Sequence, residues 1–149
     1  MSEILHILVV EDNQADIDLI RESLPDAGLV SFRIESVSRL SAAIARLKNE
    51  GIDLVLLDQG LPDSQGLETF RRLREASPLI PVIILTGNDD QEAAVAAVRE
   101  GAQYYLVKGQ VGGERLLAHS SLYAVECRRA GRRQLLAAEI LGVLMSQAT

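Results

Sequence analysis

The sequence predicts an α/β fold in which helices cover both faces of a five-stranded parallel sheet. Three features of the 149-residue chain support this prediction. Apolar runs alternate with amphipathic segments five times, turn-forming residues separate these segments, and the central apolar runs are continuous. Strict alternation with short connections favours right-handed crossovers between parallel strands. Continuous apolar strands are typical of a sheet that is buried on both faces.

The expected strands are the apolar runs. Residues 54–57 and 82–85 are apolar without alternation, as in a strand covered on both sides. Breakers such as Ser77-Pro78 and Glu100-Gly101 separate the strands from the helices. We therefore expect strands at about residues 4–10, 31–37, 53–58, 81–86 and 103–107.

The expected helices follow the strands, and several show one apolar face at i, i+3, i+4 spacing. In the first, second and fourth helices this face is formed by Ile17, Ile20 and Leu24, by Leu40, Ala43, Ile44 and Leu47, and by Ala94, Ala97 and Val98. The helices are expected at about residues 14–24, 39–49, 66–76, 90–100 and 113–129.

Composition limits the classes of function. The net charge of −6 disfavours nucleic acid as a direct partner, because phosphate backbones require a basic face. A single cysteine, Cys127, excludes an internal disulfide and fits a reducing compartment, so we expect a cytoplasmic protein. No apolar run approaches the roughly 20 residues that span a bilayer, and the N-terminus does not resemble a signal peptide.

Residues that suit phosphoryl chemistry stand at the ends of four expected strands. Glu11 and Asp12 follow the first strand, Asp58 ends the third, Thr86 ends the fourth and Lys108 follows the fifth. Since the carboxyl ends of parallel strands meet at one edge of the sheet, we expect these side chains to converge.

The three acids would repel one another unless a cation neutralised them, and Mg²⁺ favours a few carboxylates, waters and a phosphate oxygen. Asp58 is a competent nucleophile toward phosphorus, and Mg²⁺, Thr86 and Lys108 could each cover one phosphoryl oxygen. Each residue alone has a simpler explanation: the adjacent acids as helix-start residues, Asp58 and Thr86 as turn residues, Lys108 as a solvated lysine. Their joint occurrence favours the phosphoryl site.

A series of short motifs runs through the chain in a fixed order. They are Val9-Val10-Glu11-Asp12-Asn13, Leu56-Leu57-Asp58, Leu61-Pro62-Asp63-Ser64 with Gly66, Pro81-Val82-Ile83-Ile84-Leu85-Thr86-Gly87, Gly101-Ala102 and Tyr104-Tyr105-Leu106-Val107-Lys108. With these motifs, about residues 4–128 resemble the receiver domain of two-component response regulators. Lys-Gly-Gln at 108–110 resembles a subgroup of that family.

The resemblance implies a flavodoxin-like (βα)5 fold with strand order 2-1-3-4-5, formed by residues 1–129. It also implies a Mg²⁺ site. Glu11, Asp12 and Asp58 would hold the metal, together with the backbone carbonyl of Gly60.

The same resemblance implies the signalling chemistry. Asp58 would accept a phosphoryl group from the phosphohistidine of a sensor histidine kinase or phosphotransfer protein, and Lys108 would bind that group. Thr86 and Tyr105 would be the switch pair that alters a surface for a downstream protein partner or output domain. The chain would catalyse only its own phosphorylation and dephosphorylation, so we do not expect an enzyme.

Three positions depart from the family pattern. Gln59 is polar where the family usually has an apolar residue, and Gly109 stands where a cis proline is usual. A non-proline cis bond costs roughly 3–4 kcal/mol, which leaves the geometry after Lys108 open. Gly60 and Asn88 occupy positions that influence the access of water to the phosphate, so the phosphoryl lifetime is open too.

The last residues, 130–149, are too few for a DNA-binding domain. Arginines at 128, 129, 132 and 133 precede an apolar stretch in which Leu136, Ile140 and Val143 have 4–3 spacing. This segment is expected to be a helical tail that folds back or forms a homodimer, or the start of a linker. One heptad is too short to establish a coiled coil.

Other classes of function fit less well. A haloacid-dehalogenase-type phosphatase requires a second acid two residues after the nucleophile, where this chain has Gly60. A flavin phosphate would be repelled by the acids, and three tyrosines without tryptophan offer little to stack a ring. A receiver excised from a hybrid sensor, acting in a phosphorelay, and a pseudo-receiver that takes no phosphate remain as alternatives.

Overall fold

The computed structural model describes residues 3–24, 30–87, 91–110 and 116–130. A parallel sheet runs through the domain in the order β2-β1-β3-β6-β7, which is the expected order 2-1-3-4-5 of its strands along the chain. Its strands are β1 (Glu3–Val10), β2 (Val30–Val37), β3 (Leu54–Asp58), β6 (Val82–Thr86) and β7 (Tyr104–Val107).

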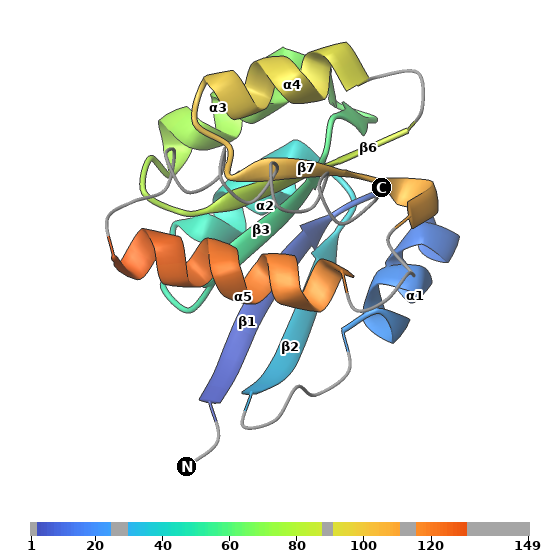
Figure 1. Cartoon of the computed structure of the whole chain (residues 1–149). Coiled ribbons are helices and arrows are strands. Elements are labelled where there is room, and N and C mark those ends of the chain that lie inside the picture. The colour runs from blue at the N-terminus through green and yellow to red at the C-terminus, as the bar shows by residue number, and fades with distance from the viewer. Residues whose placement is uncertain (1–2, 25–29, 88–90, 111–115, 131–149) are drawn as a thin grey trace.

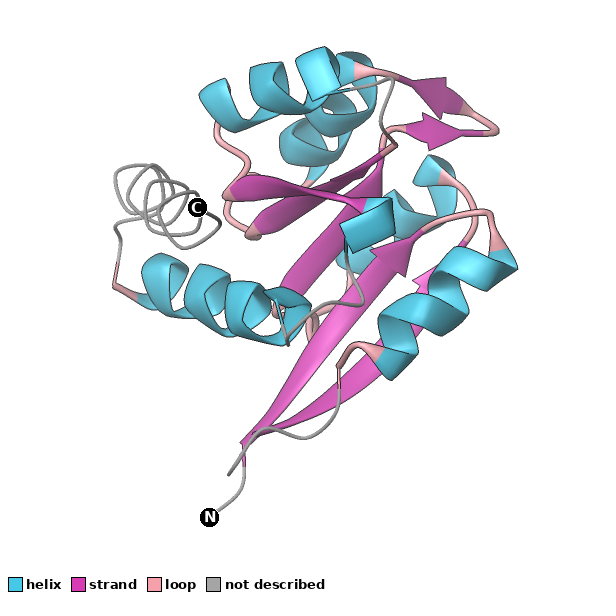
Figure 2. Ribbon diagram, turned by 45° about the vertical axis from the view of Figure 1, so that its right-hand side comes forward, coloured by secondary structure: helices cyan, strands magenta, loops and turns pink. Residues whose placement is uncertain are grey.

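Helices cover both faces of this sheet (Figures 1 and 2). One apolar cluster joins the sheet to α1 and α5, and a second cluster joins its other face to α2, α3 and α4. The doubly wound α/β fold expected from the sequence is therefore confirmed. The helices are α1 (Gln14–Glu22), α2 (Leu40–Leu47), α3 (Leu67–Ala76), α4 (Gln91–Arg99) and α5 (Leu116–Arg129).

The central strands are buried as their composition predicts. Every residue of β3 and of β6 is buried, and alternate residues of β3 enter opposite clusters, Leu56 with α1 and α5 and Leu57 with α2 to α4. The small residues Ala94 and Ala97 are fully buried on α4, so this helix lies close to the sheet. The packing thus fixes which face each strand residue occupies.

Two helices end two residues earlier than the sequence predicts. The first ends at Glu22 instead of residue 24, with Ser23 as its cap and Leu24 placed before a proline, where helical backbone is disfavoured. The second ends at Leu47 instead of residue 49. The apolar face of α1 nevertheless extends to Leu24, which is buried beyond the helix end.

A two-stranded ribbon after Asp58 is not predicted by the sequence analysis. Gly60 pairs with Gln65 and Leu61 with Ser64, forming antiparallel strands β4 (Gly60–Leu61) and β5 (Ser64–Gln65). Strands of two residues are too short for alternation to reveal. The ribbon ends at Gly66, whose φ of 67° lies in the left-handed region that favours glycine.

The tail predicted at 130–149 lies outside the described residues, except for Ala130. Its predicted helix and homodimer therefore stay predictions. Among the described helices, none is both long and apolar enough to cross a membrane.

Candidate functional site

The register of the sheet brings the predicted site residues to one edge. Asp58 is the last residue of β3 and pairs with Leu85, while Thr86 ends β6 and pairs with Val107 of β7. Lys108 follows directly in a 3-10 turn, Lys108–Gln110. The carboxyl ends of these parallel strands are therefore level, as expected for a ligand site in a doubly wound sheet.

The Lys108 ammonium group lies at the centre of the site and joins three carboxylates. Its Nζ is 2.6 Å from Glu11 Oε1, 2.9 Å from Asp58 Oδ2 and 3.3 Å from Asp16 Oδ2. The ammonium donates hydrogen bonds to Asp58 and Asp16, and its contact with Glu11 is an ion pair. Lys108, Glu11 and Asp58 lie together as the sequence predicts, but the contact with Asp16 is not predicted. Asp16 stands in the first turn of α1, where the helix dipole alone explains an acid.

The acids Glu11, Asp12 and Asp58 form a group with the geometry of a metal site. One carboxylate oxygen from each lies within 4.8 Å of the others. Glu11 is completely buried and Asp58 is 7% exposed, whereas Asp12 is exposed to solvent. Two buried oxygen donors beside one accessible donor fit Mg²⁺, which binds through a few carboxylates and keeps several waters.

The electrostatics of Glu11 support this fit. Burial, a hydrogen bond with Asp58 and the charge of Asp58 raise the pKa of Glu11 to about 8, although Lys108 acts in the opposite direction. Its Oε2 also accepts hydrogen bonds from the backbone N–H groups of Asp12 (3.0 Å) and Asn13 (3.4 Å). A buried carboxylate beside another one is costly without a cation, so the site favours added positive charge.

Lys108 is held in its charged form. Burial lowers its pKa, but the hydrogen bonds to Glu11 and Asp58 and the charges of both acids outweigh this and raise the pKa above its ordinary value. The ammonium therefore keeps its charge at any physiological pH. This suits a group that is expected to bind a phosphoryl oxygen.

Asp58 is fixed by contacts on both carboxylate oxygens. Oδ1 accepts a hydrogen bond of 2.9 Å from the backbone N–H of Gly60, and Oδ2 contacts Lys108. Gly60 thus lies beside Asp58, and the role of its carbonyl as a metal ligand stays a prediction.

The two predicted switch residues occupy neighbouring strands. Thr86 is buried, and its hydroxyl donates to the carbonyl of Gly87 at 3.1 Å. Tyr105 is half-buried and packs against the cluster under α2, α3 and α4. The adjacent Tyr104 points to the opposite face and is fully buried. Movement of Thr86 and Tyr105 stays a prediction.

The departures from the family pattern have definite positions. The described residues contain no cis peptide bond, so Lys108 and Gly109 are joined in trans. Gln59 is 4% exposed, and within the described part of the chain neither atom of its side-chain amide has a hydrogen-bond partner. Asn88 lies outside the described residues.

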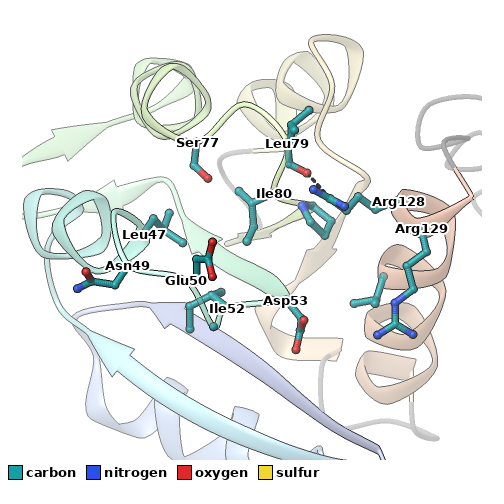
Figure 3. A pocket seen from close by; sticks show the side chains of 13 residues that line it. Leu47, Asn49, Glu50, Ile52, Asp53, Ser77, Leu79, Ile80, Arg128 and Arg129 are labelled. Carbon is teal, nitrogen blue, oxygen red and sulfur yellow. Dashed lines mark hydrogen bonds between the residues drawn. The ribbon is translucent and has the colours of Figure 1, made fainter.

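A separate cavity of about 320 Å³ lies at the opposite end of the sheet, before the starts of β3 and β6 (Figure 3). Glu50 and Asp53 line it together with Arg128 and Arg129 of α5. Arg128 Nε donates to the carbonyl of Leu79 at 2.8 Å. This cavity shares no residue with the group around Lys108.

The fold and the acid–lysine group together define a doubly wound α/β domain with an acidic pocket at the carboxyl edge of its sheet. The family model of the response regulator receiver domain matches residues 7–120 of the chain. The chain therefore belongs to the response regulator receiver domain family.

Individual relatives agree with this assignment. The chain is 38% identical over 103 residues to the KDP operon transcriptional regulatory protein KdpE of Escherichia coli, and 32% identical over 102 residues to the DNA-binding transcriptional regulator NtrC of Salmonella typhimurium. These matches cover 69% and 68% of the chain but 44% and 21% of the two relatives. The chain thus matches less than half the length of these relatives.

Solved structures share the fold. A CheY-like response regulator receiver domain protein from Methanospirillum hungatei aligns with a TM-score of 0.70 at 24% identity, covering 87% of this chain and 99% of the other. NtrX from Brucella abortus aligns with a TM-score of 0.71 at 28% identity, covering 89% of this chain and 28% of the other.

Proposed function

We propose that this chain is a phosphoacceptor domain that receives a phosphoryl group on Asp58 in a Mg²⁺-dependent reaction. The donor is the phosphohistidine of a sensor histidine kinase or phosphotransfer protein. The observation that supports this most directly is the contact of Asp58 Oδ2 with Lys108 Nζ, 2.9 Å, inside a group of acids that fits a divalent cation.

The transfer is a displacement at phosphorus. A carboxylate oxygen of Asp58 forms the new P–O bond while the P–N bond of the phosphohistidine breaks, and the electron pair of that bond returns to the imidazole nitrogen. Glu11, Asp12 and Asp58 would hold Mg²⁺, which would supply positive charge to neutralise the phosphoryl oxygens. The product is an acyl phosphate on Asp58.

The chain's own residues supply position and charge. Asp58 is nearly buried and held on both oxygens, which limits the orientations from which it attacks. Lys108 transfers its contact from Asp58 Oδ2 to a phosphoryl oxygen, and the Thr86 hydroxyl exchanges the carbonyl of Gly87 for another. The Thr86 exchange replaces a neutral hydrogen bond by a charge-assisted one, and the Lys108 exchange replaces one charge-assisted contact by another.

The output is a change of the surface for a downstream protein or output domain. Movement of Thr86 toward the phosphoryl group makes room for the half-buried Tyr105 ring to turn inward. A partner that distinguishes the two states is required for this shift to carry a signal. The proposed reaction modifies the chain's own Asp58, so we propose a switch with self-catalysed phosphorylation and dephosphorylation rather than an enzyme.

Intact-mass measurement after incubation with acetyl phosphate and Mg²⁺ tests the proposal. We expect one added phosphoryl group in the wild type, none in Asp58→Asn, and wild-type labelling in Asp18→Asn, which removes an exposed acid of α1. Labelling that persists in Asp58→Asn would place the acceptor elsewhere. A wild type that gains no mass from acetyl phosphate or from a phosphorylated phosphotransfer domain would contradict the proposed function.

A further inference from the structure

Asp16 is the one acid of the described residues that contacts Lys108 and lies outside the acid group that fits Mg²⁺. Among the described residues, three carboxylates approach the ammonium, and Glu11 and Asp58 are also members of the group that fits Mg²⁺. Asp16 contacts Nζ at 3.3 Å from the first turn of α1. We propose that Asp16 is a positioning residue that holds Lys108 when Mg²⁺ occupies Glu11 and Asp58, and that it thereby strengthens Mg²⁺ binding. This inference rests on the proposed Mg²⁺ site.

Lys108 and Mg²⁺ would compete for the same carboxylates. Lys108 Nζ lies 2.6 Å from Glu11 and 2.9 Å from Asp58, so the ammonium uses the oxygens that the metal requires. Like charges at such short range repel strongly in a partly buried site. Binding of Mg²⁺ therefore requires the ammonium to withdraw, and it withdraws most easily toward an anion that the metal does not use.

Asp16 is placed to receive the Lys108 ammonium when it withdraws. Side-chain exposure rises from 0% at Glu11 and 10% at Asp58 to 24% at Lys108 and 30% at Asp16, so the ammonium lies between the buried acids and a more accessible one. A hollow of about 10 Å³ borders Glu11, Asp16 and Lys108, which is roughly the space of one water molecule. The ammonium can shift within this space and remain paired.

The backbone beneath Asp16 is fixed. Asn13 Oδ1 accepts a hydrogen bond of 3.1 Å from the backbone N–H of Asp16, and Ile17 and Ile20 bury the inner face of the helix. Because this first turn is anchored, the Asp16 carboxylate stays within reach of Lys108 when Mg²⁺ takes Glu11 and Asp58 as ligands. The negative charge of Asp16 also interacts favourably with the dipole of α1. If this were its only role, removing the charge would lower the stability of the fold without changing the affinity for Mg²⁺.

Titration of the full chain with MgCl₂ by calorimetry separates these roles. Loss of an ion pair as exposed as this one changes an equilibrium constant by up to about fivefold. We expect Asp16→Asn to raise the Mg²⁺ dissociation constant by about fivefold and Asp16→Glu, whose longer side chain still reaches Nζ, to restore it to within about twofold. The matched control is Asp18→Asn, which removes the same charge from α1 two residues further on and leaves the affinity unchanged.

A double-mutant cycle tests whether Asp16 acts through the lysine. In a Lys108→Met background no ammonium competes, so Asp16→Asn is expected to have no more effect than Asp18→Asn. An equal loss of affinity in both backgrounds would mean that Asp16 acts by charge alone and would overturn the inference. So would a wild type and an Asp16→Asn variant that bind Mg²⁺ equally. A wild type that binds no Mg²⁺ would instead contradict the proposed site.

Phosphorylation gives a second readout. With acetyl phosphate as donor, Asp16→Asn is expected to shift the half-maximal Mg²⁺ concentration upward and to keep the maximal labelling at saturating Mg²⁺. Reduced maximal labelling with an unchanged midpoint would contradict the positioning role.

Discussion

Helix α2 is capped by a residue that lies far from it in the sequence, and removal of that cap is expected to destabilise the domain. Asp63, in the turn between β4 and β5, accepts hydrogen bonds from the backbone N–H groups of Leu40 (2.8 Å) and Ser41 (2.9 Å). Arg39, at the N-cap position, makes no side-chain cap bond. Asp63→Ala therefore leaves two helix-start donors without a protein acceptor.

The expected loss follows from these two bonds. A helix cap contributes about 1 kcal/mol to the free energy of unfolding, with a range of roughly 0.5–2 kcal/mol. A charged acceptor that binds two donors is expected in the upper half of that range. We expect Asp63→Ala to lower the free energy of unfolding by about 1.5 kcal/mol. For a domain of this size, that is a fall of about 3–6 °C in melting temperature. Asp63→Asn keeps one acceptor oxygen and is expected to lose about half as much.

The pH dependence provides an independent check. Burial raises the pKa of Asp63, but the hydrogen bonds from Ser41 and Leu40 outweigh it and hold the pKa below its ordinary value of 3.8. Because the folded pKa is lower than the unfolded one, the stabilisation is fully present above the unfolded value. It is lost as the pH falls through the folded value. The difference between wild type and Asp63→Ala should therefore be constant at neutral pH and shrink below about pH 4.

Urea unfolding followed by circular dichroism at several pH values measures both effects. Glu75→Ala, which removes an exposed acid from α3, is the control for loss of charge. If Asp63→Ala unfolded with the same free energy as Glu75→Ala, or if its deficit grew below pH 4, the capping role would be wrong.

Three further predictions concern the site and the tail. Mg²⁺ at one hundred times its dissociation constant should stabilise the wild type by about 2.7 kcal/mol and so raise its melting temperature. The melting temperature of Asp12→Ala should not rise, and equal rises would mean that Asp12 is not a metal ligand. Crystals with and without beryllofluoride should differ in the Tyr105 rotamer and in the position of Thr86, and identical side chains in both would mean that signalling uses another route. Light scattering should show a dimer for the full chain and a monomer for a version that ends at Arg129 if the apolar tail pairs two copies. Two monomers at high micromolar concentration would exclude that pairing.

The sequence predicts the fold because its strongest signals are continuous apolar runs and apolar helix faces with a 3.6-residue period. Residues 54–57 and 82–85 are uniformly apolar and became the buried strands β3 and β6, while the 3.6-residue pattern of Ile17 and Ile20 located the buried face of α1. The convergence of Glu11, Asp58 and Lys108 followed from the topology of a parallel sheet, which places all strand ends at one edge.

The features that the sequence analysis missed depend on contacts between distant residues. Asp63 caps a helix that begins 23 residues earlier, and Asp16 meets a lysine 92 residues away. Local preference alone explains an acid in a turn or at the start of a helix, so neither position indicates its distant partner. The ribbon of β4 and β5 was not predicted, because strands of two residues are too short to show an alternating pattern.

The charges at the sheet edge connect the stability of the domain to its proposed chemistry. Glu11 and Asp58 are buried beside each other, and without a metal the Lys108 ammonium is the cation that compensates them. Removing one partner of a buried pair leaves a charge without compensation, so Lys108 stabilises the metal-free fold as well as any bound phosphoryl group. The same ammonium cannot make all these contacts at once. A second anion at the rim, Asp16, allows it to exchange one set of partners for another without losing its charge compensation.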